Sequence, residues 1–182
     1  MANRAYLLSD DKVTRYIDLQ GNKVLCAANY MVPIFWYALF EETDMIEMST
    51  PTDKGGKYKY PVYAKKVKNA VDLAISRLPV IKENLKGESE KWFTIFHKYV
   101  NSQNGNLIII DPCELTWMDE DINKYIKKSK ECIRAFSTPF FEKKSHIFKE
   151  LKLTKPWQTL LGQANITEIG NDMNIYNLCG GE

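Results

Sequence analysis

The stretch Gly105-Asn106-Leu107-Ile108-Ile109-Ile110-Asp111-Pro112 decides the fold of this chain. Four aliphatic residues stand in a row between two turn-forming pairs. The turn residues limit the run to the length of a strand, and a strand without polar positions is typical of the interior of a sheet. The sequence therefore predicts a buried, central strand at residues 107–110.

Helical spacing of apolar residues surrounds this strand in the sequence. The spacing predicts one helix over residues 63–78, which Pro79 should stop or kink, and a second helix from Ser89 to about residue 101. A third amphipathic helix is expected over residues 119–136, and a fourth is expected to start at Thr138-Pro139. We also expect a short buried helix over residues 33–42, because Pro33 suits a first helical turn.

The remaining patterns indicate short strands and one loop. Alternation or β-branched content predicts strands at residues 4–8, 14–19 and 24–27, with Gly21-Asn22 as a turn. Residues 49–56 contain one proline, an aspartate and two glycines and are the clearest loop. The tail offers two further strand candidates, at 166–169 and 174–178. Together these elements predict an α+β fold, with one helix-rich domain over 1–182 and a small sheet of short strands.

Length, charge and the ends of the chain exclude several classes of protein. The chain has 182 residues, of which 45% are hydrophobic, so it can bury a core without disulfides or a metal. Its 25 Lys and Arg against 23 Asp and Glu give a net charge of +2, and a generic nucleic-acid or membrane-surface binder needs more positive charge than this. The start lacks the apolar run of a secretory signal, and no stretch spans a bilayer. We therefore expect a cytoplasmic protein without membrane contact.

The chemistry-bearing residues form no known catalytic or metal motif. The cysteines Cys26, Cys113, Cys132 and Cys179 are too far apart for a zinc site, and we expect neither a metal nor a cofactor. Cys113 follows the central strand, where catalytic residues often lie, so a hydrolase using Cys113 with His97 or His146, or a carboxylate site, stays open as an alternative.

Two acidic runs are the candidate partner-binding residues. The first run contains Glu41, Glu42, Asp44 and Glu47, without a basic residue between them. The second run, Asp119, Glu120 and Asp121, is adequately explained as charge at a helix start. Neither run has the spacing of a calcium loop. We expect the first run to be either a solvated helix end or part of a binding face.

Residues 57–86 form a basic segment. Eight Lys or Arg stand against two acidic residues, which gives the segment a charge of +6, and three tyrosines lie between the first lysines. Cations with interleaved aromatic rings can bind single-stranded nucleic acid, but lysines on a solvated helix face give the same pattern. A nucleic-acid or adaptor protein working through this segment is therefore a second alternative.

The opening Met1-Ala2-Asn3-Arg4-Ala5-Tyr6-Leu7, followed by Ser9-Asp10, resembles the start of an uncharacterised bacterial family. Members begin Met-Ala-Asn-Arg-x-Tyr-Leu and carry a Pro-containing helix near residue 33 and an aliphatic strand with an acidic end, which the 108–114 segment resembles. Some proteins of this kind are found beside contact-dependent or type VI toxins. The resemblance implies no catalytic residues, and it suggests an immunity role.

The function expected from the sequence is inhibition of a cognate bacterial toxin that acts in the cytoplasm. A protein of this kind covers the active site of the toxin with a preformed surface of about 1,600 Å² in total. If the cleft of the toxin is basic, the acidic run at 41–47, or the acidic residues of the tail, would steer and fill it. Charge reversal at Glu41, Glu42 and Asp44 should then weaken binding. The sequence leaves the oligomeric state open.

Overall fold

Five antiparallel strands form one sheet in the order β2-β1-β5-β4-β3. This is a computed structural model, and it describes residues 4–19, 23–29, 32–52, 54–84, 89–117 and 121–137. The strands are β1 (Arg4–Asp10), β2 (Val24–Asn29), β3 (Met45–Pro51), β4 (Lys57–Lys66) and β5 (Leu107–Asp111). With the helices given below, the described residues have the predicted α+β fold.

The aliphatic run at 107–110 is the middle strand of this sheet, as predicted. β5 pairs with β1 on one side, where Tyr6 lies opposite Asp111, and with β4 on the other, where Tyr63 lies opposite Ile110. Side chains of a strand alternate between the two faces of a sheet. Both faces of β5 are buried, because Ile108 and Ile110 enter one apolar cluster and Ile109 enters another.

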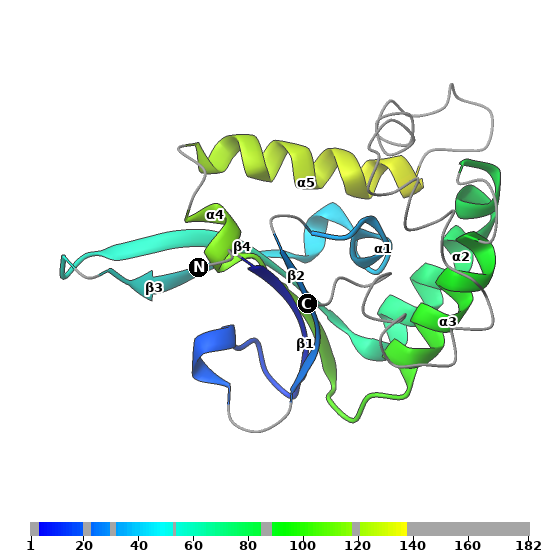
Figure 1. The fold of residues 1–182 in the computed structure, drawn as a ribbon, viewed down its shortest axis with the longest axis horizontal. Coiled ribbons are helices and arrows are strands. Elements are labelled where there is room, and N and C mark those ends of the chain that lie inside the picture. The colour runs from blue at the N-terminus through cyan, green and yellow to red at the C-terminus, as the bar shows by residue number, and fades with distance from the viewer. Residues whose placement is uncertain are drawn as a thin grey trace.

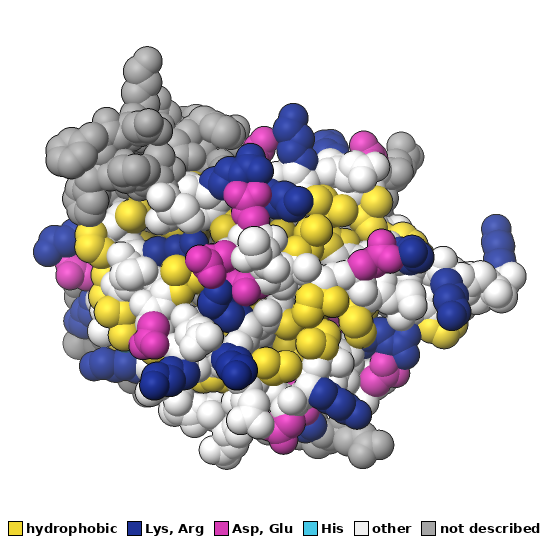
Figure 2. All heavy atoms as spheres, turned by 180° about the vertical axis from the view of Figure 1, so that it is seen from behind, with side chains coloured by type: hydrophobic (Ala, Val, Ile, Leu, Met, Phe, Trp, Pro, Cys, Tyr) yellow, Lys and Arg dark blue, Asp and Glu magenta, His cyan; other side chains and the backbone are white. Residues whose placement is uncertain are grey.

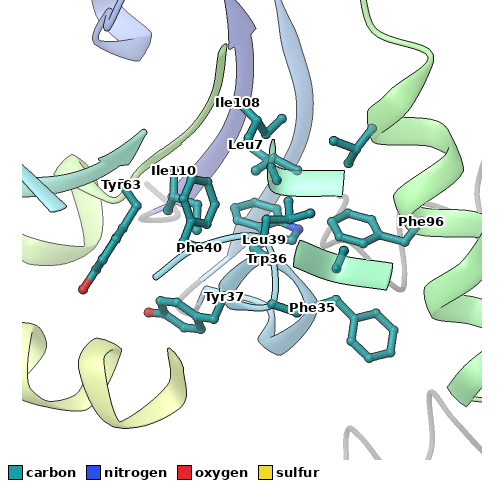
Figure 3. Close-up of a cluster of buried hydrophobic side chains, with 14 of the residues drawn as sticks. Leu7, Phe35, Trp36, Tyr37, Leu39, Phe40, Tyr63, Phe96, Ile108 and Ile110 are labelled. Atoms are coloured by element: carbon teal, nitrogen blue, oxygen red, sulfur yellow. The ribbon is translucent and has the colours of Figure 1, made fainter. Parts of the chain in front are cut away.

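Helices cover one face of the sheet (Figure 1). The described helices are α1 (Ile34–Tyr37), α2 (Val67–Asn84), α3 (Ser89–Asn101), α4 (Cys113–Thr116) and α5 (Ile122–Ser137), with 3-10 turns η1 (Tyr16–Asp18) and η2 (Glu42–Asp44). The larger core joins α1, α2, α3 and α5 to the sheet. Its centre is an aromatic group from the segment around α1, which meets Leu7, Tyr63 and Ile110 of the strands (Figure 3).

A smaller core lies on the opposite face. Tyr6, Leu8, Tyr60, Val62 and Ile109 are its buried residues. The segment around η1 covers them, and Cys113 of α4 packs at their side. The β3–β4 hairpin projects from the body of the molecule beside this smaller core (Figure 1).

Several sequence predictions agree with the structure. β1 and β2 contain the strands expected at 4–8 and 24–27, and α3 begins at Ser89 as expected. α5 matches the helix expected over 119–136, although its first residue in the structure is Ile122. The expected helix after Thr138-Pro139 and the strands at 166–169 and 174–178 lie outside the described residues, so the single domain over 1–182 stays a prediction.

The expected strand at 14–19 is wrong. The chain forms the turn η1 there, with the N–H of Leu19 donating to the carbonyl of Tyr16 at 3.2 Å. The Arg15 guanidinium bonds the Asp18 carboxylate and, at 3.0 Å, the carbonyl of Ser49 in β3. These side-chain contacts favour a turn that lies over the sheet, and they outweigh the local alternation of residue types.

The segment 45–66 was also assigned incorrectly. The expected loop at 49–56 is confirmed only for its second half, because β3 continues to Pro51. The helix expected from Tyr63 starts at Val67, since residues up to Lys66 pair with β5. Every second residue of β4 packs on the smaller core, namely Tyr58, Tyr60 and Val62. This two-residue period is that of a strand, and the chain follows it past Tyr63, where the helical spacing of apolar residues begins.

Two predictions about prolines need correction as well. The helix expected over 33–42 is a single turn, α1, followed by three-residue turns up to Phe40. Pro79 does not stop α2, which continues to Asn84. The carbonyl that Pro79 leaves without a donor belongs to Ile75, whose side chain is 47% exposed, so water reaches this side of the helix.

Candidate functional site

Each carboxylate of the run at 41–47 has a cationic partner within the chain. The ammonium group of Lys65 lies 2.6 Å from a carboxylate oxygen of Glu41 and 2.8 Å from one of Asp44. The run follows α1 and enters β3, at one edge of the sheet. Asp44 also accepts a hydrogen bond from the N–H of Glu41 at 2.7 Å, which closes the turn η2. The hydrogen bond from Lys65 lowers the pKa of Glu41.

The other two carboxylates of this run have their partners on α5 and β4. Glu42 accepts a two-pronged contact from Arg134 of α5, with Nη2 to Oε2 at 2.7 Å, and this contact lowers the pKa of Glu42. Glu47 accepts from Lys59 of the neighbouring strand at 2.7 Å. The predicted acidic surface is therefore neutralised by the fold, and its residues join η2 to β4 and α5.

In the second acidic run, the structure describes Asp121 alone, and this residue caps the start of α5. Asp121 accepts a hydrogen bond from the N–H of Asn123 at 2.9 Å and so caps the first turn of α5. Its side chain is exposed. Asp119 and Glu120 lie outside the described residues.

The basic segment 57–86 does not form one surface. It divides into β4 and α2, and several of its cations are engaged. Lys59 and Lys65 pair with the carboxylates given above, and Lys82 lies 3.2 Å from Glu90. Arg77 is buried in the larger core. Lys57, Lys66 and Lys68 are exposed, but they lie on two different elements. Over residues 57–84, the part of this segment that the structure describes, there is no continuous basic surface for the nucleic-acid alternative.

Cys113 lies in a buried, acidic environment. It opens α4 directly after β5, and its N–H donates to the buried carboxylate of Asp111 at 2.9 Å. Asp111 also accepts from the N–H of Tyr16 at 2.7 Å. Burial, and the charge of Asp111 after it, raise the pKa of the Cys113 thiol to about 11. At neutral pH this group is a thiol, which is a weak nucleophile.

Of the two histidines that the hydrolase alternative offers to Cys113, the structure places His97 elsewhere. His97 packs against Phe93, at 6.0 Å between ring centroids, and Phe93 belongs to the larger core. Cys113 packs at the smaller core, on the other face of the sheet. His146 and Cys179 are outside the described residues. No group of three His, Cys, Asp or Glu with the geometry of a metal site occurs in the part of the chain that the structure describes.

A group of aromatic and aliphatic side chains near the smaller core was missed by the sequence analysis. Trp117, at the end of α4, is 50% exposed, and its ring centroid lies 5.0 Å from that of Tyr58. Ile46 points to the same side of the sheet, because it lies opposite Val62. Ile17 belongs to η1, whose neighbours Tyr16 and Leu19 pack on the smaller core, and its side chain is 63% exposed. We call Trp117, Tyr58, Ile46 and Ile17 the aromatic face.

Hydrophobic side chains gather on the back of the molecule beside the projecting hairpin, with charged side chains around them (Figure 2). In the sequence, only the alternation of Tyr58 and Tyr60 with lysines indicated the aromatic face. Nothing local marks Trp117 as exposed, because its exposure depends on how α4 packs against β1 and β4.

No helix in the described ranges combines the length and hydropathy needed to cross a membrane. Comparison of the chain with models of protein families, with curated proteins and with solved structures finds no match.

Proposed function

We propose that this chain is an immunity protein of the bacterial cytoplasm, which binds a cognate protein toxin and covers its active site. The observation that carries the proposal is the aromatic face, with Trp117 half exposed and seated on Tyr58. The resemblance of the opening residues to a family that includes neighbours of toxins supports the toxin as the partner.

The aromatic face has the properties of a protein-binding surface. Tryptophan is among the residues that most often dominate the energy of protein interfaces, above all where its ring is already ordered by a neighbour. Tyr58 orders the Trp117 ring on one side, and Tyr60 stacks on Tyr58 with ring centroids 6.1 Å apart. Exposed aliphatic residues on the same side, Ile17 and Ile46, extend the apolar area that a partner would bury.

The acidic run at 41–47 is less suited to this role. Its four carboxylates are already paired within the chain, so a partner would have to displace Lys65, Arg134 or Lys59 before binding them. We therefore place the docking surface at the aromatic face, and we assign the acidic run to holding η2 against its neighbours.

If the proposal is right, the gene of the toxin adjoins the gene of this chain, and titration calorimetry with the product of that gene tests the proposal. We expect Trp117→Ala to weaken binding by about 2 kcal/mol, which is typical of an interface anchor. The matched control is Ile75→Ala, because Ile75 is 47% exposed on α2, away from the aromatic face. A third variant, Glu42→Lys, should leave the affinity unchanged while lowering stability by up to about 1 kcal/mol.

The outcomes are distinct. Absence of binding between the wild-type chain and that toxin contradicts the proposed function. Binding that tolerates Trp117→Ala but not Glu42→Lys keeps the function and returns the interface to the acidic run.

A further inference from the structure

The outer side of α5 carries more positive charge than any other described helix. Between Ile122 and Ser137 there are five cations and one acid, Glu131, which gives a net charge of +4. The cations are Lys124, Lys127, Lys128, Lys130 and Arg134. At 3.6 residues per turn, Lys124 and Lys127 lie on the side opposite the buried residues Ser129, Ile133 and Phe136, and Lys128 lies at the flank, one turn before the buried Cys132.

The three lysines differ from the other charged groups in how they are paired. Arg134 is held by Glu42, and Lys130 lies close enough to lower the pKa of Glu42 further. Lys124, Lys127 and Lys128 are exposed, and among the described residues they make no ion pair. Among the described residues, the carboxylates at 41–47 are paired with cations, whereas these three lysines are not, and the exposed Asp121 at the start of α5 offsets one of the three charges.

The helix that carries the lysines is firmly seated. Its inner side contributes Cys132, Ile133 and Phe136 to the larger core. The hydroxyl groups of Ser129 and Tyr63 are hydrogen-bonded at 2.8 Å, within the core. A helix fixed in this way holds its outer lysines at constant spacing, about 6 Å between Lys124 and Lys128 along the axis. Such preorganisation lowers the entropic cost of binding.

The helix that carries the lysines begins beside the aromatic face. α5 begins five residues after Trp117, and Ile122 packs against the smaller core together with Tyr58 and Cys113. α4 lies directly beside the start of α5 (Figure 1). A partner that covers Trp117 therefore meets the N-terminal half of α5 at the margin of the same interface.

We infer that Lys124, Lys127 and Lys128 dock a carboxylate-rich surface of the protein partner, beside the contact made by Trp117. This inference rests on the proposed function and specifies the surface chemistry of the partner. The signs of charge are the reverse of those predicted from the sequence, which were an acidic surface on this chain and a basic cleft on the toxin.

Two observations favour an acidic protein over a nucleic acid. The whole chain has a net charge of only +2, whereas affinity for phosphate backbones depends on many cations acting together. The helix that carries the lysines begins beside an apolar surface, and the combination of an apolar centre with a charged margin is typical of protein interfaces. Charges at such a margin steer association more than they add to affinity.

Fluorescence anisotropy with labelled poly-L-glutamate tests the inference without the toxin. We compare the wild type with the triple variant Lys124→Glu, Lys127→Glu, Lys128→Glu at low salt. The matched control reverses three exposed lysines on other elements, as Lys54→Glu, Lys66→Glu and Lys68→Glu. We expect the α5 variant to bind poly-L-glutamate at least about tenfold more weakly than this control. Circular dichroism checks that both variants fold, and Gln in place of Glu provides a milder version.

Three results overturn the inference. The first is equal loss of binding in the two triple variants, which would reflect net charge alone. The second is no binding of poly-L-glutamate by the wild type. The third is tighter binding of a labelled oligothymidylate of equal charge, lost in the α5 variant, which would assign the lysines to nucleic acid.

Titration with the toxin separates this inference from the proposed function. If Trp117→Ala weakens toxin binding and the α5 variant does not, the proposed function stands and the role of the lysines is rejected. If the α5 variant slows association with the toxin and the control triple variant does not, both are supported.

Discussion

Arg77 donates a hydrogen bond to the carbonyl oxygen of Phe40 at 2.7 Å, across 37 residues of sequence. The same nitrogen, Nη1, lies 3.2 Å from the carbonyl of Tyr37 and 2.9 Å from that of Ala38. These carbonyls end the single turn of α1, where a helix leaves acceptors without partners. A cation from α2 thus completes a helix end, and burial lowers the pKa of Arg77 to about 10.

We expect Arg77→Met to lower the free energy of unfolding by about 3 kcal/mol or more. Methionine fills much of the same volume but donates no hydrogen bond, so the carbonyls after α1 lose their donor, at about 1–3 kcal/mol for each buried group left unpaired. Urea unfolding followed by tryptophan fluorescence measures the change.

Lys68→Met is the matched control for Arg77→Met. Lys68 is exposed on the same helix, and surface substitutions usually stay within about 0.5 kcal/mol. Equal effects of the two variants would show that Arg77 does not stabilise the end of α1.

The sequence predicts the parts of the fold that depend on local pattern. Residues 107–110 have no polar position, and this places them in the middle of the sheet whatever their neighbours are. α3 and α5 are also evident, because their apolar residues keep one face over several turns. The β3–β4 hairpin could not be predicted, since Tyr63 satisfies both a helical and a strand pattern, and the pairing with Ile110 decides between them.

The candidate site was harder to predict than the fold, because pairing is a tertiary property. Glu42 has no cation near it in the sequence, and its partner Arg134 is 92 residues away. The exposure of Trp117 likewise depends on the packing of α4. The lysines of α5 were visible in the sequence, but their significance appears only when the carboxylates at 41–47 are seen to be paired with other cations.

His97 should make the protein less stable in mild acid. Burial lowers its pKa below the usual 6.5, so the unfolded chain binds the proton more readily than the folded chain. The contribution of neutral His97 to the free energy of unfolding is therefore fully present above about pH 6.5. It falls as the pH decreases toward the lower pKa of the folded chain, by at most about 1.4 kcal/mol per pH unit.

Urea unfolding at a series of pH values, with the wild type and His97→Gln, checks this prediction. As the pH falls below about 6.5, the unfolding free energy of the wild type should decrease more than that of His97→Gln. A difference that stays constant across this range would show that His97 is protonated as easily in the folded chain as in the unfolded one.

Cys113 should react slowly with alkylating reagents while the chain is folded. Its pKa of about 11 lies about 2 units above the usual value of 9.0, so at a given pH near 8 the thiolate fraction is about a hundredfold smaller than in the unfolded chain. Labelling with iodoacetamide, followed by mass spectrometry of the peptide that contains Cys113, compares the folded protein with the protein in urea. The partial burial of Cys113 adds to the protection. Labelling of the folded protein as fast as in urea would show that Cys113 is an ordinary, accessible thiol. Labelling faster than in urea would identify an activated nucleophile beside Asp111, and it would favour the hydrolase alternative over an inhibitor that acts only by binding.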